Sequence, residues 1–548
     1  MTEKWGRTVA LMAVLWMGGS ALLAQDTLHS PLSIPLWFSG NFGEIRTGHF
    51  HTGMDIRTQG REGVPVLAAQ PGRISRVKVS DRGYGLALYL DGEGKTTVYA
   101  HLSAFHPDIE EWLRETQYAA EQWAFDGPPT QTFSFEAGDT IGWSGNSGRS
   151  FGPHLHFEVR DARTQWPLNP LRWTFEGEGM TEDRIPPEFR AVWVMPTEGS
   201  TVEGESARFR WNPAYGDGVR VAGGFRLGVE AFDRLDREPF THGPYGMDVW
   251  LDSVMVHSHR MDTLDFSTNG DVSAHIDVAA WQDRRTRIHR LHRLPGNRLD
   301  IYRSASGMEP LEVMPGDSAR LEVRLLDVAG NETTAGMWLI GDSAATSSDM
   351  SDGPQALDHR TRHRLTEGRI QVELPAGALY GDAAVALVDD SSGVYGVMSE
   401  ARLTRSRYRL TLPVPDELKG SGEVVVVCTL DDDGEVDDTW VADEKSGVVQ
   451  IRPKSFGRFE VRRDSVGPEL GRPFIEDGEL RLAVADDLAG VETWEARCGG
   501  RWIRLGLEKG VLRHPLDDGV LTEGEEVRVW AVDAAGNLGH RTFRWPLD

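Results

Sequence analysis

The chain has 548 residues, 39% of them hydrophobic, and a formal net charge of −26. At roughly 100 to 200 residues per domain, this length predicts three or four domains. The negative charge excludes nucleic acid as a partner and argues against electrostatic adhesion to anionic polymers. Only Cys428 and Cys498 are present. A disulfide scaffold is therefore excluded, and we expect two buried free thiols in different domains.

Residues 1–24 have the features of a secretory signal peptide. Lys4 and Arg7 precede a short apolar run, and small residues follow it. A basic segment, a short apolar stretch and small residues at the cleavage point are the parts of such a peptide. A retained membrane anchor is the alternative, but it needs about 20 consecutive apolar residues. We therefore expect export, cleavage after Ala21 or Ala24, and no stable membrane span afterwards.

Residues 30–178 are predicted to form an antiparallel β-domain with one inserted helix. Short apolar segments such as 64–69, 85–90 and 97–100 are separated by turns that contain glycine, which is typical of antiparallel sheet. Between residues 107 and 125, apolar residues recur at helical spacing, and two acids lie near the start, where the helix dipole favours them. Because the helix lies between polar motifs that must converge, we expect it to flank the cleft.

Two polar motifs lie at opposite ends of this domain. They are H-x-G-x-D, which contains His51 and Asp55, and H-x-H, which contains His154 and His156. Side chains two or four residues apart on a strand point the same way, so both spacings aim polar groups together. Two histidines and a carboxylate are enough to hold zinc and leave a fourth position for water, as in catalytic zinc sites. The pattern therefore predicts a hydrolase. His101, at the end of another strand, is a further candidate.

The C-terminal two thirds of the chain are predicted to be mainly β. The turn at 327–331, Asp-Val-Ala-Gly-Asn, is echoed at 533–537 by Asp-Ala-Ala-Gly-Asn. The echo predicts related immunoglobulin-like or fibronectin-like sandwich modules at both ends of this region. The expected divisions are a β-sandwich at 185–340, a linker at 341–355, a β-rich domain at 356–463 and an immunoglobulin-like sandwich at 464–548.

The segment from residue 39 to about 173 closely resembles the lysostaphin and LytM family of zinc endopeptidases, which cut peptide bonds in bacterial peptidoglycan. Its motifs follow one another in the order found in that family. The markers are the two motifs above with residues 66–69, Gly72, 83–85, 99–103, 138–142 and 144–148. The resemblance implies that His51, Asp55 and His156 bind one zinc ion and that His101 and His154 are catalytic. Histidine titrates in the range needed to take a proton from water or to hold an oxyanion. Which of the two is the base stays open.

The resulting hypothesis is a periplasmic or secreted zinc metalloendopeptidase. It would hydrolyse stem peptides or cross-links of peptidoglycan, with the bond from D-alanine to meso-diaminopimelate as the expected target. Peptidoglycan peptides are its expected partners, and protein partners are unknown. Two alternatives are a non-enzymatic regulator of other wall hydrolases and a surface adhesion protein that carries a peptidase domain. All five polar positions are present, which favours the enzyme.

Other polar residues have weaker claims. We expect His49 to be a surface residue or a supporting neighbour of the site. His257 and His259 repeat the H-x-H spacing without a matching acid motif, so we expect incidental surface placement rather than a second metal. The basic run from Arg284 to Arg293 is expected to pair within the molecule. The alternative for this run is a patch for carboxylates on wall peptides.

Overall fold

The computed structural model describes residues 27–547 except 178–182, 214–217, 237–238, 304–306, 344–354, 390–392, 421–422 and 432. The predicted signal peptide lies outside the described residues, as does most of the predicted linker. Within the described part of the chain, no helix is both long and apolar enough to cross a membrane. The fold is mainly β, as expected. The predicted domain boundaries stay predictions, and we refer to four units, numbered 27–177, 183–343, 355–464 and 465–547.

The first unit is built around an antiparallel sheet in the order β10-β7-β8-β9-β13-β5-β2. Its interior is closed by large side chains such as Tyr99 and Phe157, whose rings meet edge to face with centroids 5.4 Å apart. These strands are β2 (Phe38–Gly40), β5 (Met54–Arg57), β7 (Gly72–Val79), β8 (Leu86–Asp91), β9 (Lys95–Phe105), β10 (Phe125–Gly127) and β13 (His154–Asp161). Shorter strands are β1 (Thr27–His29), β3 (Ile45–Arg46), β4 (His49–Phe50), β6 (Pro65–Leu67), β11 (Ser134–Phe135), β12 (Thr140–Ser144), β14 (Pro167–Leu168) and β15 (Thr174–Glu176).

The inserted helix, α1 (Pro107–Ala120), is shorter than the predicted span of 107–125. Proline at the first turn suits a helix start, and Ile109, Trp112 and Leu113 form its buried face. The helix ends because Glu121 adopts a left-handed conformation with φ of 48°. Phe125 instead pairs with Val79 in the sheet.

Each of the other three units consists of two sheets that share one hydrophobic core, which is the organisation of a β-sandwich. The second unit contains β16 (Glu188–Pro196), β17 (Thr201–Val202), β18 (Phe209–Trp211), β19 (Gly218–Ala222), β20 (Phe225–Phe232), β21 (Gly246–Leu251), β22 (Val254–Arg260), β23 (Ile288–Arg290), β24 (Ser318–Leu326) and β25 (Glu332–Gly341). Two short helices that the sequence analysis did not predict, α2 (Val272–His275) and α3 (Val278–Arg284), lie between β22 and β23.

The third and fourth units repeat the two-sheet plan. The third contains β26 (Gln355–Leu357), β27 (His363–Glu367), β28 (Ile370–Leu374), β29 (Ala383–Asp389), β30 (Val394–Met398), β31 (Arg409–Pro413), β32 (Val424–Leu430), β33 (Val436–Ala442), β34 (Val448–Ile451) and β35 (Gly457–Asp464). The fourth contains β36 (Glu469–Leu470), β37 (Phe474–Glu476), β38 (Glu479–Ala485), β39 (Val491–Cys498), β40 (Arg501–Trp502), β41 (Gly506–Glu508), β42 (Val511–Pro515), β43 (Glu526–Asp533) and β44 (Leu538–Arg544). Cys428 and Cys498 are buried and free, one in each unit.

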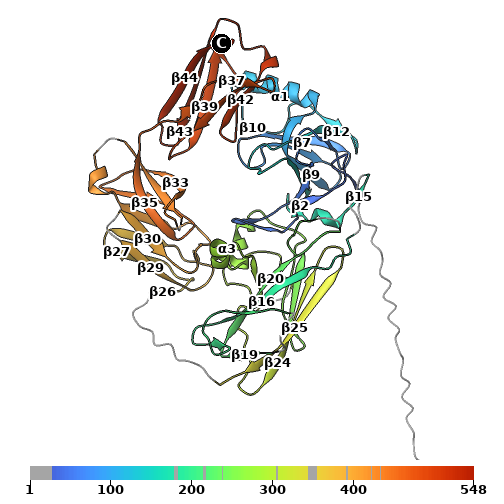
Figure 1. The fold of residues 1–548 in the computed structure, drawn as a ribbon, viewed down its shortest axis with the longest axis vertical. Helices are drawn as coiled ribbons and strands as arrows, with labels where there is room; N and C mark the ends of the chain where they lie inside the picture. Colours follow the sequence, from blue (N-terminus) through green and yellow to red (C-terminus); the bar gives the residue numbers. More distant parts are fainter. Residues whose placement is uncertain are drawn as a thin grey trace, which may run out of the picture.

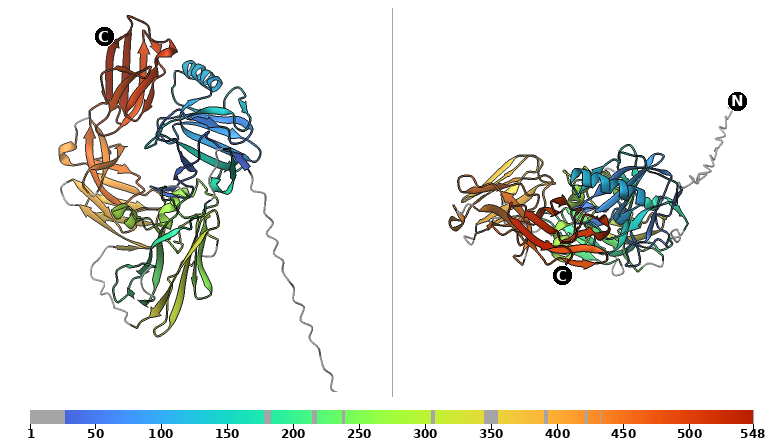
Figure 2. Two further views of the ribbon diagram at one scale, coloured as in Figure 1. Left: turned by 45° about the vertical axis from the view of Figure 1, so that its right-hand side comes forward. Right: turned by 90° about the horizontal axis from the view of Figure 1, so that it is seen from above.

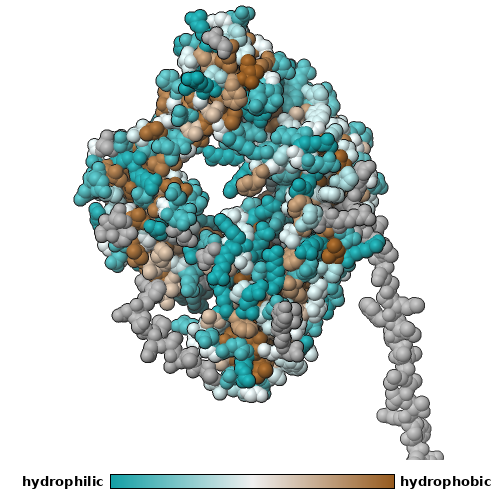
Figure 3. Space-filling model, in the orientation of Figure 1, coloured by the Kyte–Doolittle hydropathy of each residue, from teal (hydrophilic) through white to brown (hydrophobic). Residues whose placement is uncertain are grey.

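The four units form a ring in which the last returns to the first (Figures 1 and 2). The fourth unit lies against α1, and Figure 3 shows an opening through the middle of the ring. The closing contacts are a hydrogen bond from Tyr118 to Asp518 of 2.6 Å, an ion pair between Arg497 and Glu121 of 2.5 Å, and a ring contact between Trp123 and Trp494. The inserted helix is therefore the surface on which the ring closes.

Candidate metal centre

Strand pairing brings the two distant polar motifs together. β13 runs antiparallel to β5 and places His156 directly opposite Asp55, while β9 flanks β13 on its other side. His51 lies in the turn just before β5. Gly53 lies between the two residues of the first motif, and a Cβ atom there would be only 2.4 Å from the carbonyl oxygen of Phe157. Glycine is therefore required for β5 to approach β13 this closely.

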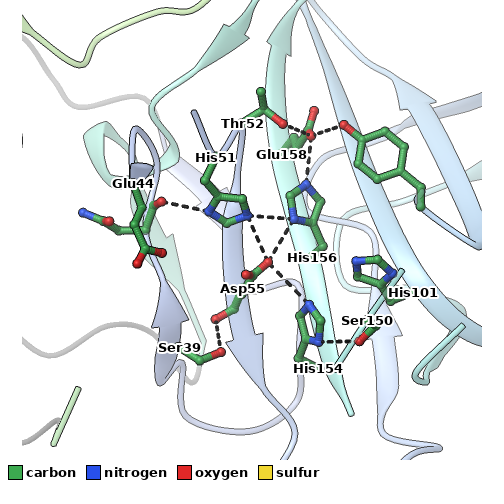
Figure 4. A network of polar contacts seen from close by, with 12 residues as sticks. Ser39, Glu44, His51, Thr52, Asp55, His101, Ser150, His154, His156 and Glu158 are labelled. Carbon is green, nitrogen blue, oxygen red and sulfur yellow. Dashed lines mark hydrogen bonds and ion pairs between the residues drawn. The ribbon is translucent and has the colours of Figure 1, made fainter. Parts of the chain in front are cut away.

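One atom from each of His51, Asp55 and His156 converges on a common point (Figure 4). His51 Nε2 is 3.0 Å from His156 Nδ1, and the two nitrogens are 3.0 and 2.9 Å from Asp55 Oδ1. Ligands of tetrahedral zinc lie about 3.3 Å apart, given zinc–nitrogen distances of about 2.0–2.1 Å. The three atoms therefore have nearly the spacing that a zinc ion needs.

Each imidazole is oriented by a hydrogen bond on its other nitrogen. His51 Nδ1 lies 2.8 Å from the carbonyl oxygen of Asn41, and His156 Nε2 lies 2.8 Å from Glu158 Oε1. Both partners are acceptors, so the N–H of each ring points at them and the lone pair of the other nitrogen faces the common point. The residues present therefore fit zinc in chemistry as well as in spacing.

Glu158 is fully buried and has a hydrogen-bond partner on both oxygens. Thr52 and Tyr84 donate to Oε1 at 2.7 and 2.6 Å, and Arg160 Nε donates to Oε2 at 2.6 Å. Burial alone would raise the pKa of Glu158, but the Arg160 charge and the His156 hydrogen bond hold it well below its usual value. Burial alone would lower the pKa of His156, but the neighbouring carboxylates of Asp55 and Glu158 raise it to about 9.

The carboxylate of Asp55 is held from outside the three-atom cluster. Arg46 donates to its Oδ2 at 2.7 Å and also contacts Glu44, which pairs with Arg287 of the second unit at 3.3 Å. Burial would raise the pKa of Asp55, but the neighbouring imidazoles of His51, His154 and His156 hold it well below its usual range. Asp55 therefore remains ionised and can act as a ligand.

His101 and His154 lie beside the cluster, with ring centroids 4.7 Å apart. His154 Nε2 is 3.4 Å from Asp55 Oδ1. His101 lies on β9 at a point where the pairing with β8 shifts register, and its φ is +60°. Positive φ in a non-glycine residue at such a bulge is costly, which is typical of functional positions. Burial, with the charges of His156 and His154, lowers the pKa of His101 to about 3.

Comparison with known proteins finds relatives for part of the chain. No family model matches the chain. Over 128 residues, the chain is 34% identical to the DD-carboxypeptidase/endopeptidase Mpg of Neisseria meningitidis, a segment that covers 23% of each protein. Over 173 residues, it is 27% identical to lysostaphin of Staphylococcus simulans, covering 30% of each. The matched segment is similar to lysostaphin/LytM-type peptidases, and we refer to the first unit as the LytM-type unit.

Part of the chain also matches a solved structure. The catalytic domain of the prophage-encoded M23 protein EnpA from Enterococcus faecalis is 23% identical over 25% of this chain and 95% of that chain, with a TM-score of 0.19. The chain spans less than a third of the length of the curated relatives named above.

The structure brings all five predicted residues of the LytM-type unit together and adds others that the sequence analysis missed. Glu158 and Arg160 continue the two-residue spacing of His154 and His156 along β13, so the strand period could have identified them. Tyr84 was noted only as part of a family marker. Arg46 had no signal in the sequence, because it reaches Asp55 through the fold of the preceding loop.

The remaining candidates differ from expectation in one respect. His49 is exposed, as one of its two expected placements required, and its Nδ1 lies 3.1 Å from the carbonyl oxygen of Thr47. The prediction that His257 and His259 lie on the surface is wrong, because both side chains are fully buried in the second unit. Alternation along β22 would place them on one face, but the sequence did not show that this face is covered.

The basic run contacts groups inside the molecule. Arg287 pairs with Glu44, while Arg290 and Arg293 donate to backbone carbonyl groups. Through its ion pair with Glu44, Arg287 connects the second unit to Arg46, the residue that holds Asp55.

Proposed function

We propose that the protein is an exported zinc metalloendopeptidase that hydrolyses peptide bonds of peptidoglycan. The observation that carries this proposal is the convergence of His51, Asp55 and His156 within 3.0 Å of one another, with two further histidines beside them. Support for the substrate class comes from the names of the two relatives, a DD-carboxypeptidase/endopeptidase and lysostaphin.

His51, Asp55 and His156 would hold the zinc ion. When bound, zinc supplies a Lewis acid for the scissile carbonyl group and lowers the pKa of a water molecule to about 7. The chain itself must then orient the peptide, accept the proton of the attacking water and stabilise the charge that develops on the carbonyl oxygen.

The two flanking histidines are suited to the proton and charge tasks. His101 Nδ1 lies 2.8 Å from the carbonyl oxygen of Ser147, and His154 Nδ1 lies 2.8 Å from that of Gly152. In both rings Nδ1 is thus the donor, which leaves Nε2 as the atom that can accept a proton. Once protonated there, the same ring can donate to an oxyanion. Which histidine has which role is not assigned.

A cavity of about 290 Å³ supports an extended substrate site beside His101. It is shared by three parts of the ring: the LytM-type sheet, the inserted helix segment and the fourth unit. Its lining includes Leu102, Ser103, Ser147, Leu113, Trp123, Glu479, Arg504 and Gly506. We propose that the fourth unit narrows the binding site and restricts which peptide can enter, with the bond from D-alanine to meso-diaminopimelate as the expected target.

The test is digestion of purified peptidoglycan followed by mass spectrometry of the products. Wild-type protein should release peptides cut at one defined bond, and His154→Ala should release none while it keeps its zinc. His49→Ala, which changes an exposed histidine two residues from a ligand, is the matched control and should retain activity. Stoichiometric zinc without any cleavage, or protein that binds no metal at the three-residue cluster, would favour the alternative of a regulator of other hydrolases.

A further inference from the structure

A second group of histidines lies in the interior of the second unit. His259 on β22, His275 on α2 and His289 on β23 each place one ring nitrogen within 4.8 Å of the others. The exposed fractions of the three residues are 0%, 0% and 3%. Residues up to 30 positions apart in sequence are therefore brought to one buried point by two strands and a short helix.

One pair of these nitrogens has the same separation as a pair in the peptidase cluster. His275 Nε2 is 3.0 Å from His289 Nδ1, the same separation as between His51 Nε2 and His156 Nδ1. Two imidazole nitrogens at this distance either share a proton or face a common ion. The same separation occurs in the first cluster, whose three atoms have nearly the spacing that a zinc ion needs.

One ring nitrogen of His259 lacks a hydrogen-bond partner among the described residues. Its Nδ1 lies 2.9 Å from His257 Nε2, whereas its Nε2 is buried and has no hydrogen-bond partner among the described residues. A buried polar atom without a partner costs about 1–3 kcal/mol. A metal ion would satisfy Nε2 and remove this cost.

His275 and His289 are also oriented so that a ring nitrogen of each can bind the same ion. His275 Nδ1 lies 3.1 Å from the hydroxyl of Tyr302, which leaves Nε2 to face His289. Burial lowers the pKa of His259, His275 and His289, in the last case to about 4.

We propose that His259, His275 and His289 bind a second transition-metal ion, with zinc as the ion that three imidazoles suit best at this spacing. The site is enclosed, so its role is structural. The His275 ring lies 5.6 Å from that of Phe50, the residue before His51, and Asn269 hydrogen-bonds both the N–H and the carbonyl of Phe50. The ion would thus brace the second unit against the segment that carries a peptidase ligand.

The experiment counts metal in the full-length protein by inductively coupled plasma mass spectrometry after gel filtration. Wild type should hold two zinc equivalents. The double variant His51→Ala/Asp55→Ala, which removes the first site, should keep one. X-ray absorption of that variant should show nitrogen ligands of imidazole type. If the double variant is folded and holds no metal, the second site does not exist, and this outcome is independent of whether the protein cleaves peptidoglycan.

Variants of the second site complete the test. His275→Ala/His289→Ala should lose one of the two equivalents, and its thermal unfolding should no longer respond to zinc in a His51→Ala/Asp55→Ala background. His292→Gln changes a buried histidine outside the group and should keep both ions, with circular dichroism confirming the fold of each variant. Retention of two equivalents in His275→Ala/His289→Ala would overturn the assignment.

Discussion

His156 Nε2 lies 2.8 Å from Glu158 Oε1, and both side chains lie on the same face of β13. One oxygen of Glu158 thereby orients the ring, while the other accepts a hydrogen bond from the charged side chain of Arg160. The orientation of the His156 ring, and so of the nitrogen that faces Asp55 and His51, is set by a carboxylate two residues further along the strand. This carboxylate–histidine pair is an arrangement that raises the basicity of a metal ligand.

Glu158→Gln should weaken zinc binding and peptidoglycan hydrolysis together. The amide lacks the negative charge that stabilises the His156 N–H, so we expect a loss of about 10–100-fold in zinc affinity. Competition with a chromophoric chelator measures the affinity, and cleavage assays at saturating zinc separate metal loss from a direct catalytic effect. Glu136→Gln, at an exposed position of the same unit, is the control and should behave as wild type. Unchanged zinc affinity in Glu158→Gln would show that the carboxylate does not support the ligand.

Gly53→Ala should prevent assembly of the metal centre without unfolding the chain. The added methyl would lie 2.4 Å from the carbonyl oxygen of Phe157 and 3.1 Å from the His156 ring, so β5 must move away from β13. We expect loss of bound zinc and of activity, measured by elemental analysis and digestion assays. Gly152→Ala places its methyl in open space and should keep its zinc. A Gly53→Ala protein with full metal content would contradict the close-approach argument.

The sequence predicted the site well because strand geometry is local. A period of two aligns His154 with His156, and one antiparallel pairing is enough to bring them to Asp55. It did not predict Arg46, whose contact with Asp55 depends on the path of an irregular loop. The end of α1 at Ala120 was missed because the apolar spacing continues past Glu121, whose left-handed conformation no local signal shows.

The histidines of the second unit show the same limit. H-x-H at 257–259 is the same local pattern as H-x-H at 154–156, yet its partners, His275 and His289, lie on a helix and a strand that no motif connects to it. Ring closure between α1 and the fourth unit joins residues about 400 positions apart, such as Tyr118 and Asp518. Contacts of that range depend on the packing of whole units, which periodicity along the chain does not encode.

Replacing the helix-bearing segment between residues 107 and 125 with a short linker should alter substrate choice more than zinc content. The segment contributes Leu113 and Trp123 to the shared cavity and contacts the fourth unit, but it provides none of the five site residues. We expect a changed ratio of products from defined peptidoglycan fragments at unchanged zinc stoichiometry. Tyr118→Phe removes only the hydrogen bond to Asp518 and should shift the product ratio less. Loss of zinc on replacement would show that the segment supports the metal centre instead.

The stability of the second unit should fall as the pH rises, because three carboxylates crowd together there. Asp183, Asp233 and Asp327 each place an oxygen within 4.8 Å of the others. Burial, together with the Asp327 charge, raises the pKa of Asp233 to about 8, and burial raises the pKa of Asp183 to about 6. An unfolded aspartate has a pKa of about 3.9. The folded state thus binds more protons, and stability that is fully present below pH of about 4 is lost as the pH rises through about 8.

Asp233→Asn should therefore stabilise the protein more at pH 8.5 than at pH 5. A gain on the order of 1 kcal/mol corresponds to a rise in Tm of roughly 2–4 °C for a unit of this size, measurable by differential scanning calorimetry. Asp300→Asn, at an exposed position of the same unit, should change Tm at neither pH. Since the amide cannot ionise, the difference between variant and wild type must grow with pH. If the Tm difference between variant and wild type is constant from pH 5 to 8.5, Asp233 has an ordinary pKa and the three carboxylates do not destabilise the folded unit.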